Sequence, residues 1–134
     1  MRVRDLPTKP VLAVEAQTSL AEVATRMRLN DTDSVAVMAQ DGLLGIITER
    51  DIVRAIADDV DPQRATANLF MSADPVTTDL DEDVSVAAIR MLELGIRHLP
   101  VVDHNGLPIG LLSAHDLLAV LDRSVVSPVE DEGN

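Results

Sequence analysis

Residues 45–51 read Gly45-Ile46-Ile47-Thr48-Glu49-Arg50-Asp51, and residues 110–116 read Gly110-Leu111-Leu112-Ser113-Ala114-His115-Asp116. Both stretches contain a glycine, two apolar residues, a hydroxyl-bearing residue and, three positions later, an aspartate. The apolar residues predict a strand, and the hydroxyl followed by a carboxylate predicts the first turn of a helix. The same pattern 65 residues further along the chain indicates an internal duplication.

The duplication extends in both directions from this motif. Pro10-Val11 corresponds to Pro75-Val76, and Gly42-Leu43 corresponds to Gly106-Leu107 with an offset of 64. Identities are few, but the class of residue is kept almost throughout. The chain therefore reads as two copies of one unit of about 60 residues, a period typical of repeat architectures.

Each unit predicts the element order β-α-β-β-α. We expect extended runs at 11–14 and 76–77, strands at 34–39 and 98–103, glycine-containing turns, and further strands at 43–47 and 109–112. Apolar residues at helical spacing define the first helix of each unit: Leu20, Val23, Ala24 and Met27, then Val84, Ala87, Ala88 and Met91. Ser19 and Asp83 are the expected N-caps, and Gly95 is an expected helix end.

These elements predict an α+β fold in which the two units pack through their sheets, because neither unit alone carries a sufficient core. We expect repeat 1 at residues 1–60, a polar linker at 61–74, repeat 2 at 75–124 and an acidic tail at 125–134. The two repeats then form one module.

The composition excludes several classes of protein. The 134 residues carry a net charge of −12, one aromatic side chain and no cysteine. A broad nucleic-acid interface needs a basic face, and disulfides or zinc–thiolate sites need cysteine, so we expect none of these. No segment has the apolar length of a membrane span, and residues 1–10 lack an apolar signal core, so we expect a soluble cytoplasmic protein.

Two polar features are candidates for binding. Thr48 with Asp51, and Ser113 with Asp116, either cap helices or present a hydroxyl and a carboxylate to a cleft, where a carboxylate can accept both ribose hydroxyls. Arg97-His98 is either an exposed surface pair or a phosphate contact, with arginine as a bidentate donor.

Other candidate chemistries fail on their residues. Asp79, Asp81 and Asp83 resemble the start of a calcium loop, but valine and arginine occupy the positions that need glycine and glutamate. Ser113, His115 and Asp116 crowd one helical turn, which leaves nothing to orient a general base. We therefore predict no metal site, no catalytic residues and no cofactor.

The duplicated unit resembles the CBS domain pair, also called the Bateman module. The resemblance rests on the two motifs above, on residues 97–103 (Arg-His-Leu-Pro-Val-Val-Asp) and on residues 74–77 (Asp-Pro-Val-Thr). It implies two repeats related by pseudo-two-fold symmetry, with two clefts between them. It also implies a stand-alone pair that forms a homodimer and binds an adenosine-containing ligand: AMP, ADP, ATP, S-adenosylmethionine or NAD.

The resemblance also implies which residues bind. In the second repeat Asp116 and Ser113 would hold the ribose, Arg97 and His98 the phosphates, and Val76 and Thr77 would line the adenine. In the first repeat Asp51 and Thr48 match the ribose motif, and Val11 and Leu12 would line the base. Asp33 and Ser34 replace the basic pair there, so a phosphate would need Arg50 or the other repeat, and we expect one occupied site rather than two.

Two hypotheses follow from these features. In the first, an adenine nucleotide in a cleft near Arg97, His98 and Asp116 changes the packing of the repeats, and an unidentified protein partner responds. In the second, the module is a ligand-free dimeric interaction module, and the four motif residues Thr48, Asp51, Ser113 and Asp116 only cap helices.

Overall fold

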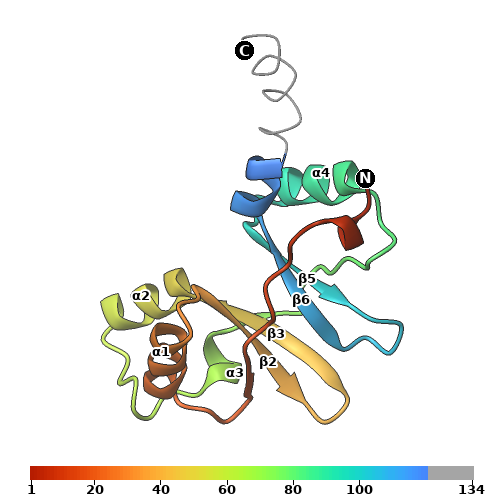
Figure 1. Cartoon of the computed structure of the whole chain (residues 1–134). Coiled ribbons are helices and arrows are strands. Elements are labelled where there is room, and N and C mark those ends of the chain that lie inside the picture. Colours follow the sequence, from red (N-terminus) through yellow and green to blue (C-terminus); the bar gives the residue numbers. More distant parts are fainter. Residues whose placement is uncertain (121–134) are drawn as a thin grey trace.

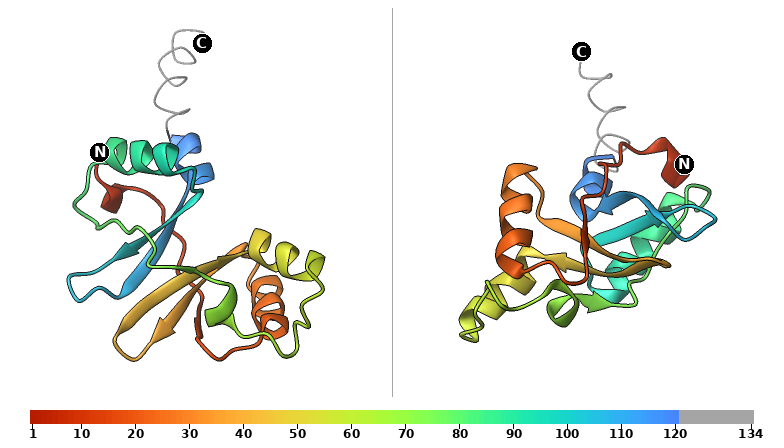
Figure 2. Two further views of the ribbon diagram at one scale, coloured as in Figure 1. Left: turned by 180° about the vertical axis from the view of Figure 1, so that it is seen from behind. Right: turned by 90° about the horizontal axis from the view of Figure 1, so that it is seen from below.

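Two β-hairpins lie against each other in the middle of the molecule, and the helices lie on its outside (Figure 1, Figure 2). The structure is a computed structural model, and it describes residues 1–120. The predicted acidic tail at 125–134 lies outside the described residues. Within them, the two tandem repeats and the α+β class are confirmed.

The elements of the chain follow the predicted order. The first part contains η1 (Val3–Asp5), β1 (Ala13–Glu15), α1 (Leu20–Leu29), β2 (Ser34–Ala39), β3 (Gly42–Thr48) and α2 (Glu49–Ala57). The second part contains α3 (Ala67–Phe70), β4 (Ser72–Ala73), α4 (Val84–Leu94), β5 (His98–Val102) and β6 (Pro108–Ser113), followed by helical residues from 114 to 120.

The predicted helix ends are confirmed. The Ser19 hydroxyl accepts a hydrogen bond from the backbone N–H of Glu22 at 3.1 Å, and the Asp83 carboxylate accepts one from the backbone N–H of Ser85 at 2.8 Å. Donation by the hydroxyl and backbone N–H of Ser85 lowers the pKa of Asp83 below its ordinary value. Gly95 ends α4 with φ of 65°, a left-handed conformation that glycine adopts without strain.

The two sheets have related topologies. In the first sheet β1 pairs parallel with β2, which pairs antiparallel with β3, and β3 pairs antiparallel with β4. In the second sheet β5 pairs antiparallel with β6, and single bridges join Thr78 to Val101 and Lys9 to Leu111. The strand predicted at 76–77 is wrong, because the parallel contact forms at Thr78 and Val76 is 38% exposed.

The stretch of chain that precedes each repeat, its lead-in segment, packs on the other repeat. Ala65 and Ala67 are buried in the first core, whereas Val3 and Leu6 are buried in the second core. The predicted linker at 61–74 is therefore wrong as a linker, because it supplies α3 and β4 to the first repeat. The first residues of the predicted repeat 1 also contribute to the other core, since Val3 of η1 packs on repeat 2.

Backbone and ionic contacts fix the N-terminal segment on the second repeat. The N–H of Val3 donates to the carbonyl of Glu82 at 2.9 Å, and the N–H of Arg4 donates to that of Leu80 at 3.0 Å. The Arg4 guanidinium also pairs with Asp81, and its hydrogen bond holds the pKa of that carboxyl below its usual range. Figure 1 shows the N-terminus beside α4 as a result.

The glycine of each repeated motif lies where an exchanged segment crosses its strand. A Cβ at Gly45 would lie 2.6 Å from the carbonyl oxygen of Ser72 and 2.6 Å from Sδ of Met71. A Cβ at Gly110 would lie 3.1 Å from Oγ1 of Thr8. At Gly45 the crossing backbone leaves no room for a side chain, whereas at Gly110 the close contact is with the Thr8 side chain.

A small apolar cluster joins the two sheets. Ala36 and Ile46 come from the first hairpin and Leu111 comes from the second, and all three are buried. The cluster is a contact of packed side chains from both repeats, so it fixes how the two hairpins lie relative to each other.

The two motif glycines generate the first prediction. We expect Gly45→Ala to lower the free energy of unfolding by roughly 1–3 kcal/mol, since the new methyl group meets backbone that cannot move independently. Gly110→Ala is the matched control and should lower it by less, because the Thr8 side chain can rotate. Urea unfolding followed by far-UV circular dichroism measures both, and equal losses would contradict this account of the crossing.

Candidate functional site

Two clefts open beside the contact between the sheets. Cleft A, of about 770 Å³, is lined by residues that include Lys9, Val11, Leu12, Ser34, Leu111, Ser113 and Asp116. Cleft B, of about 390 Å³, is lined by residues that include Ile46, Thr48, Arg50, Asp51, Arg54, Val76 and Arg97. Each cleft takes side chains from both repeats.

The structure groups the predicted site residues differently from the sequence analysis. Asp116 and Ser113 line cleft A together with Val11 and Leu12. Asp51, Thr48 and Arg50 line cleft B together with Val76 and Arg97, and His98 lines both clefts. Thr77 is not among the residues that line either cleft, and its carbonyl accepts a hydrogen bond from Arg90 at 2.7 Å.

The predicted grouping of Asp116 with Arg97 and Val76 is therefore wrong. The cause is the exchange of the lead-in segments. Lys9 bridges to Leu111 in the second repeat, and Val11 and Leu12, which follow Lys9, line the same cleft as Ser113. Ala73 pairs with Gly45 in the first repeat, and Val76 lines the same cleft as Thr48 and Asp51. Each helix start thus faces the lead-in segment of the other repeat.

Three arginines border cleft B. Arg50, Arg54 and Arg97 are all exposed, and within residues 1–120 none of them forms an ion pair. Arg54 was missed by the sequence analysis, although it lies one helical turn after Arg50 and so on the same face of α2. Unpaired guanidinium groups at a cleft are suited to a bidentate anion such as phosphate.

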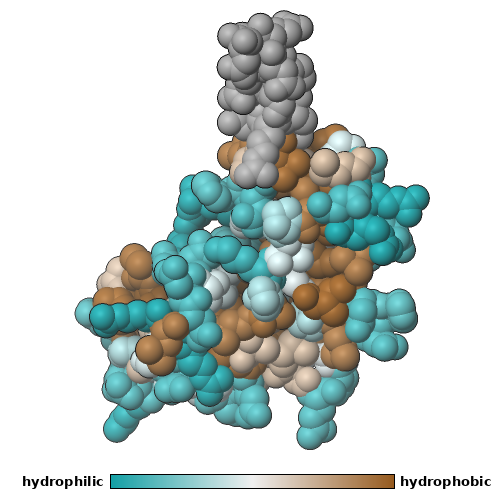
Figure 3. All heavy atoms as spheres, viewed as in Figure 1, coloured by the Kyte–Doolittle hydropathy of each residue, from teal (hydrophilic) through white to brown (hydrophobic). Residues whose placement is uncertain are grey.

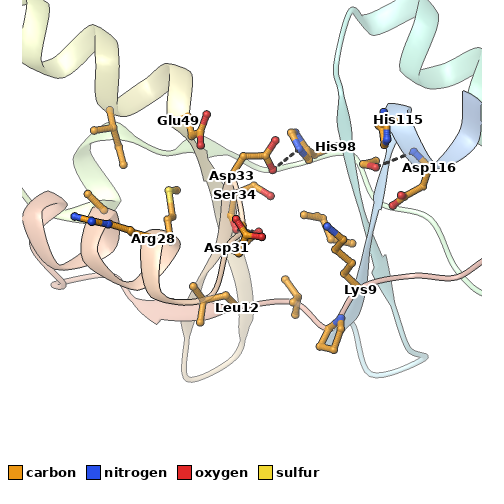
Figure 4. Close-up of a pocket in the computed structure, with 18 of the residues that line it drawn as sticks. Lys9, Leu12, Arg28, Asp31, Asp33, Ser34, Glu49, His98, His115 and Asp116 are labelled. Atoms are coloured by element: carbon orange, nitrogen blue, oxygen red, sulfur yellow. Dashed lines mark hydrogen bonds and ion pairs between the residues drawn. The ribbon is translucent and has the colours of Figure 1, made fainter. Parts of the chain in front are cut away.

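A hydrogen bond between a histidine and an aspartate joins the repeats at the boundary of the two clefts. Nε2 of His98 lies 3.0 Å from Oδ1 of Asp33, and both residues line cleft A and cleft B. The aspartate that replaces the basic pair in the first repeat is therefore the partner of the histidine in the second repeat. Figure 4 shows this contact spanning the space between the two hairpins.

The two helix starts use opposite halves of the capping motif. Oδ2 of Asp51 accepts hydrogen bonds from the Thr48 backbone N–H at 2.9 Å and from its hydroxyl at 3.3 Å. In the second repeat the Ser113 hydroxyl instead accepts from the backbone N–H of Asp116 at 3.0 Å. Oδ2 of Asp116 is buried and has no hydrogen-bond partner within the described part of the chain.

The described residues offer neither a metal site nor a membrane span. Residues 1–120 contain no group of three or more histidine, aspartate or glutamate side chains placed to hold a metal ion. Among the helices of the same residues, none has the length and apolar character needed to cross a bilayer.

The chain belongs to the CBS domain family, whose profile matches residues 3–58 and again residues 67–123. An uncharacterized protein of Methanopyrus kandleri is 33% identical over 132 residues, which cover 97% of this chain and 67% of that protein. The repeat pattern of the sequence and the family match therefore agree.

Solved CBS structures share the fold. The CBS domain pair of protein MJ0100, in complex with 5′-methylthioadenosine and S-adenosylmethionine, superposes with a TM-score of 0.84 at 26% identity, covering 92% of this chain and 98% of that one. The CBS domain protein of Pyrobaculum aerophilum, complexed with AMP, has a TM-score of 0.82 at 29% identity and covers 93% and 99%.

The capping geometry generates the second prediction. Asp51→Ala removes a carboxylate that bonds the helix start, so we expect it to lower the free energy of unfolding by about 1 kcal/mol. Asp116→Ala removes an oxygen with no partner and should change stability less. Calorimetric unfolding of the two variants without added nucleotide compares them, and a larger loss for Asp116→Ala would contradict this assignment.

Proposed function

We propose that the protein is a regulatory module that binds an adenosine-containing ligand between its repeats, with a phosphorylated ligand such as AMP in cleft B. The observation that carries this proposal is the set of three arginines without ion-pair partners around that cleft, within residues 1–120. AMP in a protein of the same fold supports the ligand class.

Each cleft B residue has a distinct role in the proposal. Oδ1 of Asp51 is not used by the helix cap and accepts a ribose hydroxyl, with Thr48 beside it. Arg97 and Arg50 donate to the phosphate, which His98 also faces. The apolar side chain of Val76 lines the adenine, the role that Val11 and Leu12 take in cleft A.

Ligand binding acts on the packing of the repeats. A nucleotide in cleft B contacts Asp51 from one repeat and Arg97 from the other, so it stabilises one arrangement of the two hairpins. A protein partner that binds this arrangement preferentially then responds to the ligand. In this proposal the module regulates and performs no catalysis.

The third prediction concerns the phosphate contact. We expect Arg97→Ala to weaken AMP binding by about 2 kcal/mol, the typical value for a hydrogen bond to a charged group. Arg64→Ala is the matched control, because Arg64 has a side chain that is 90% exposed and lies outside both clefts. Isothermal titration calorimetry measures both. Equal AMP affinity in the two variants would reject cleft B as the phosphate site.

A ligand-free interaction module is the second candidate, and the exposed apolar side chains of the outer helices favour it. Leu92 on α4 is 83% exposed, Leu118 is 66% exposed and Val53 on α2 is 65% exposed. Figure 3 shows apolar surface over α2 and near α4. We propose that a second copy of the chain covers this surface in a homodimer, with or without a ligand.

The fourth prediction tests this surface. Sedimentation velocity should show a dimer at micromolar concentration, and Leu92→Glu should shift it toward monomer because a charge is costly to bury in an apolar contact. Leu107→Glu is the control, since Leu107 is 42% exposed in the turn between β5 and β6, outside α2, α4 and residues 114–120. A wild-type monomer at all concentrations would exclude the homodimer.

A further inference from the structure

Asp33 and Arg97 occupy equivalent positions in the two repeats but carry opposite charges. Asp33 directly precedes β2, and Arg97 directly precedes β5. The carbonyl of Asp33 accepts a hydrogen bond from the N–H of Glu49 at 3.0 Å. In the same way, the carbonyl of Arg97 accepts one from the N–H of Ala114 at 2.8 Å. Each residue is therefore fixed by its backbone at the start of the second helix of its own repeat.

Only one of the two equivalent contacts between the repeats forms. Nε2 of His98 lies 3.0 Å from Oδ1 of Asp33. At the offset of the repeat, Ser34 corresponds to His98 and Arg97 corresponds to Asp33. Within residues 1–120 the Ser34 hydroxyl has no hydrogen-bond partner and Arg97 forms no ion pair. In this part of the chain, Arg97 thus remains available to a ligand, whereas His98 is held by Asp33.

The Asp33–His98 contact occupies a hydrogen-bond donor that a ligand in cleft B could use. An ionised carboxylate only accepts hydrogen bonds, so Nε2 of His98 carries the hydrogen and donates it. The side chain of His98 is 13% exposed, and it lines cleft B together with Arg97. A phosphate in that cleft would offer a second anionic acceptor for the same N–H. Asp33 and the phosphate would therefore compete for one donor.

The other carboxylates of cleft B do not hold this donor. Glu49 and Asp51 also line the cleft. Oδ2 of Asp51 accepts from Thr48 in the helix cap, and within residues 1–120 Glu49 forms no contact of this kind with His98. In Figure 4 the Asp33 side chain points toward His98, whereas Glu49 lies apart from the contact. All three carboxylates repel a phosphate, but of the three it is Asp33 that also occupies a donor from the other repeat.

From this we infer that Asp33 is an affinity-determining residue of cleft B, which lowers the affinity for an anion by holding His98 across the repeats. The contact has to open before Nε2 of His98 can donate to a phosphate, so only part of the population is competent to bind. The inference rests on the proposed function, because the competing anion is the phosphate of the proposed ligand. Removal of the Asp33 carboxylate should then strengthen binding. A contact that only joins the repeats predicts unchanged or weaker binding, since its loss would loosen the cleft.

The test measures AMP binding to the full chain by isothermal titration calorimetry. We expect Asp33→Ala to raise the AMP affinity about fivefold, the effect of one typical hydrogen bond. Asp33→Asn should act in the same direction by a smaller factor, because the amide remains an acceptor but loses the charge. Glu49→Gln is the matched control. It removes a carboxylate from the same cleft without altering the His98 contact, so it should change the affinity by less than about twofold.

A double-mutant cycle tests whether Asp33 acts through His98. The three arginines remain in His98→Ala, so this variant should still bind AMP, and adding Asp33→Ala to it should change the affinity by less than about twofold. Unchanged or weaker AMP binding by Asp33→Ala would overturn the inference. An equal gain in Glu49→Gln, or the same fivefold gain in the absence of His98, would overturn it as well. Each of these results leaves the proposed function intact, whereas AMP binding by neither the wild type nor any variant would overturn both.

Discussion

The exchange of lead-in segments between the repeats is the constraint on which the rest of the structure depends. Val3 and Leu6 complete the second core, and Ala65 and Ala67 complete the first. The core of each repeat is therefore completed by residues from the segment that precedes the other repeat in the chain. The same exchange carries each lead-in segment past the helix start of the opposite repeat, so both clefts combine side chains from the two halves of the chain.

The repeated element order could be predicted from the sequence because it depends on local signals. Helical periodicity, the caps at Ser19 and Asp83, and the stop at Gly95 are read from a few neighbouring residues. The exchange could not be predicted in this way. It depends on which repeat buries residues such as Val3 and Ala67, and their apolar character is the same whichever core accepts them.

The candidate site was also predicted only in part: its residues could be found from the sequence, but their grouping into clefts could not. Most of the residues singled out by the motifs do line a cleft, but their grouping was wrong because it assumed that each repeat builds its own site. Asp33 was read as the loss of a basic residue, whereas it is the partner of His98 across the repeats. Only tertiary structure shows this contact, since the two residues are 65 positions apart in the chain.

The central claim is that AMP binds between the repeats, and a methyl NMR titration of the isotopically labelled protein tests it most directly. Intrinsic fluorescence is a poor probe, because the sequence contains no tryptophan or tyrosine. The account predicts that methyl resonances of Ile46 in the first repeat and Val76 in the second shift together with one dissociation constant. Shifts confined to one repeat, or no saturable shift at millimolar AMP, would contradict it.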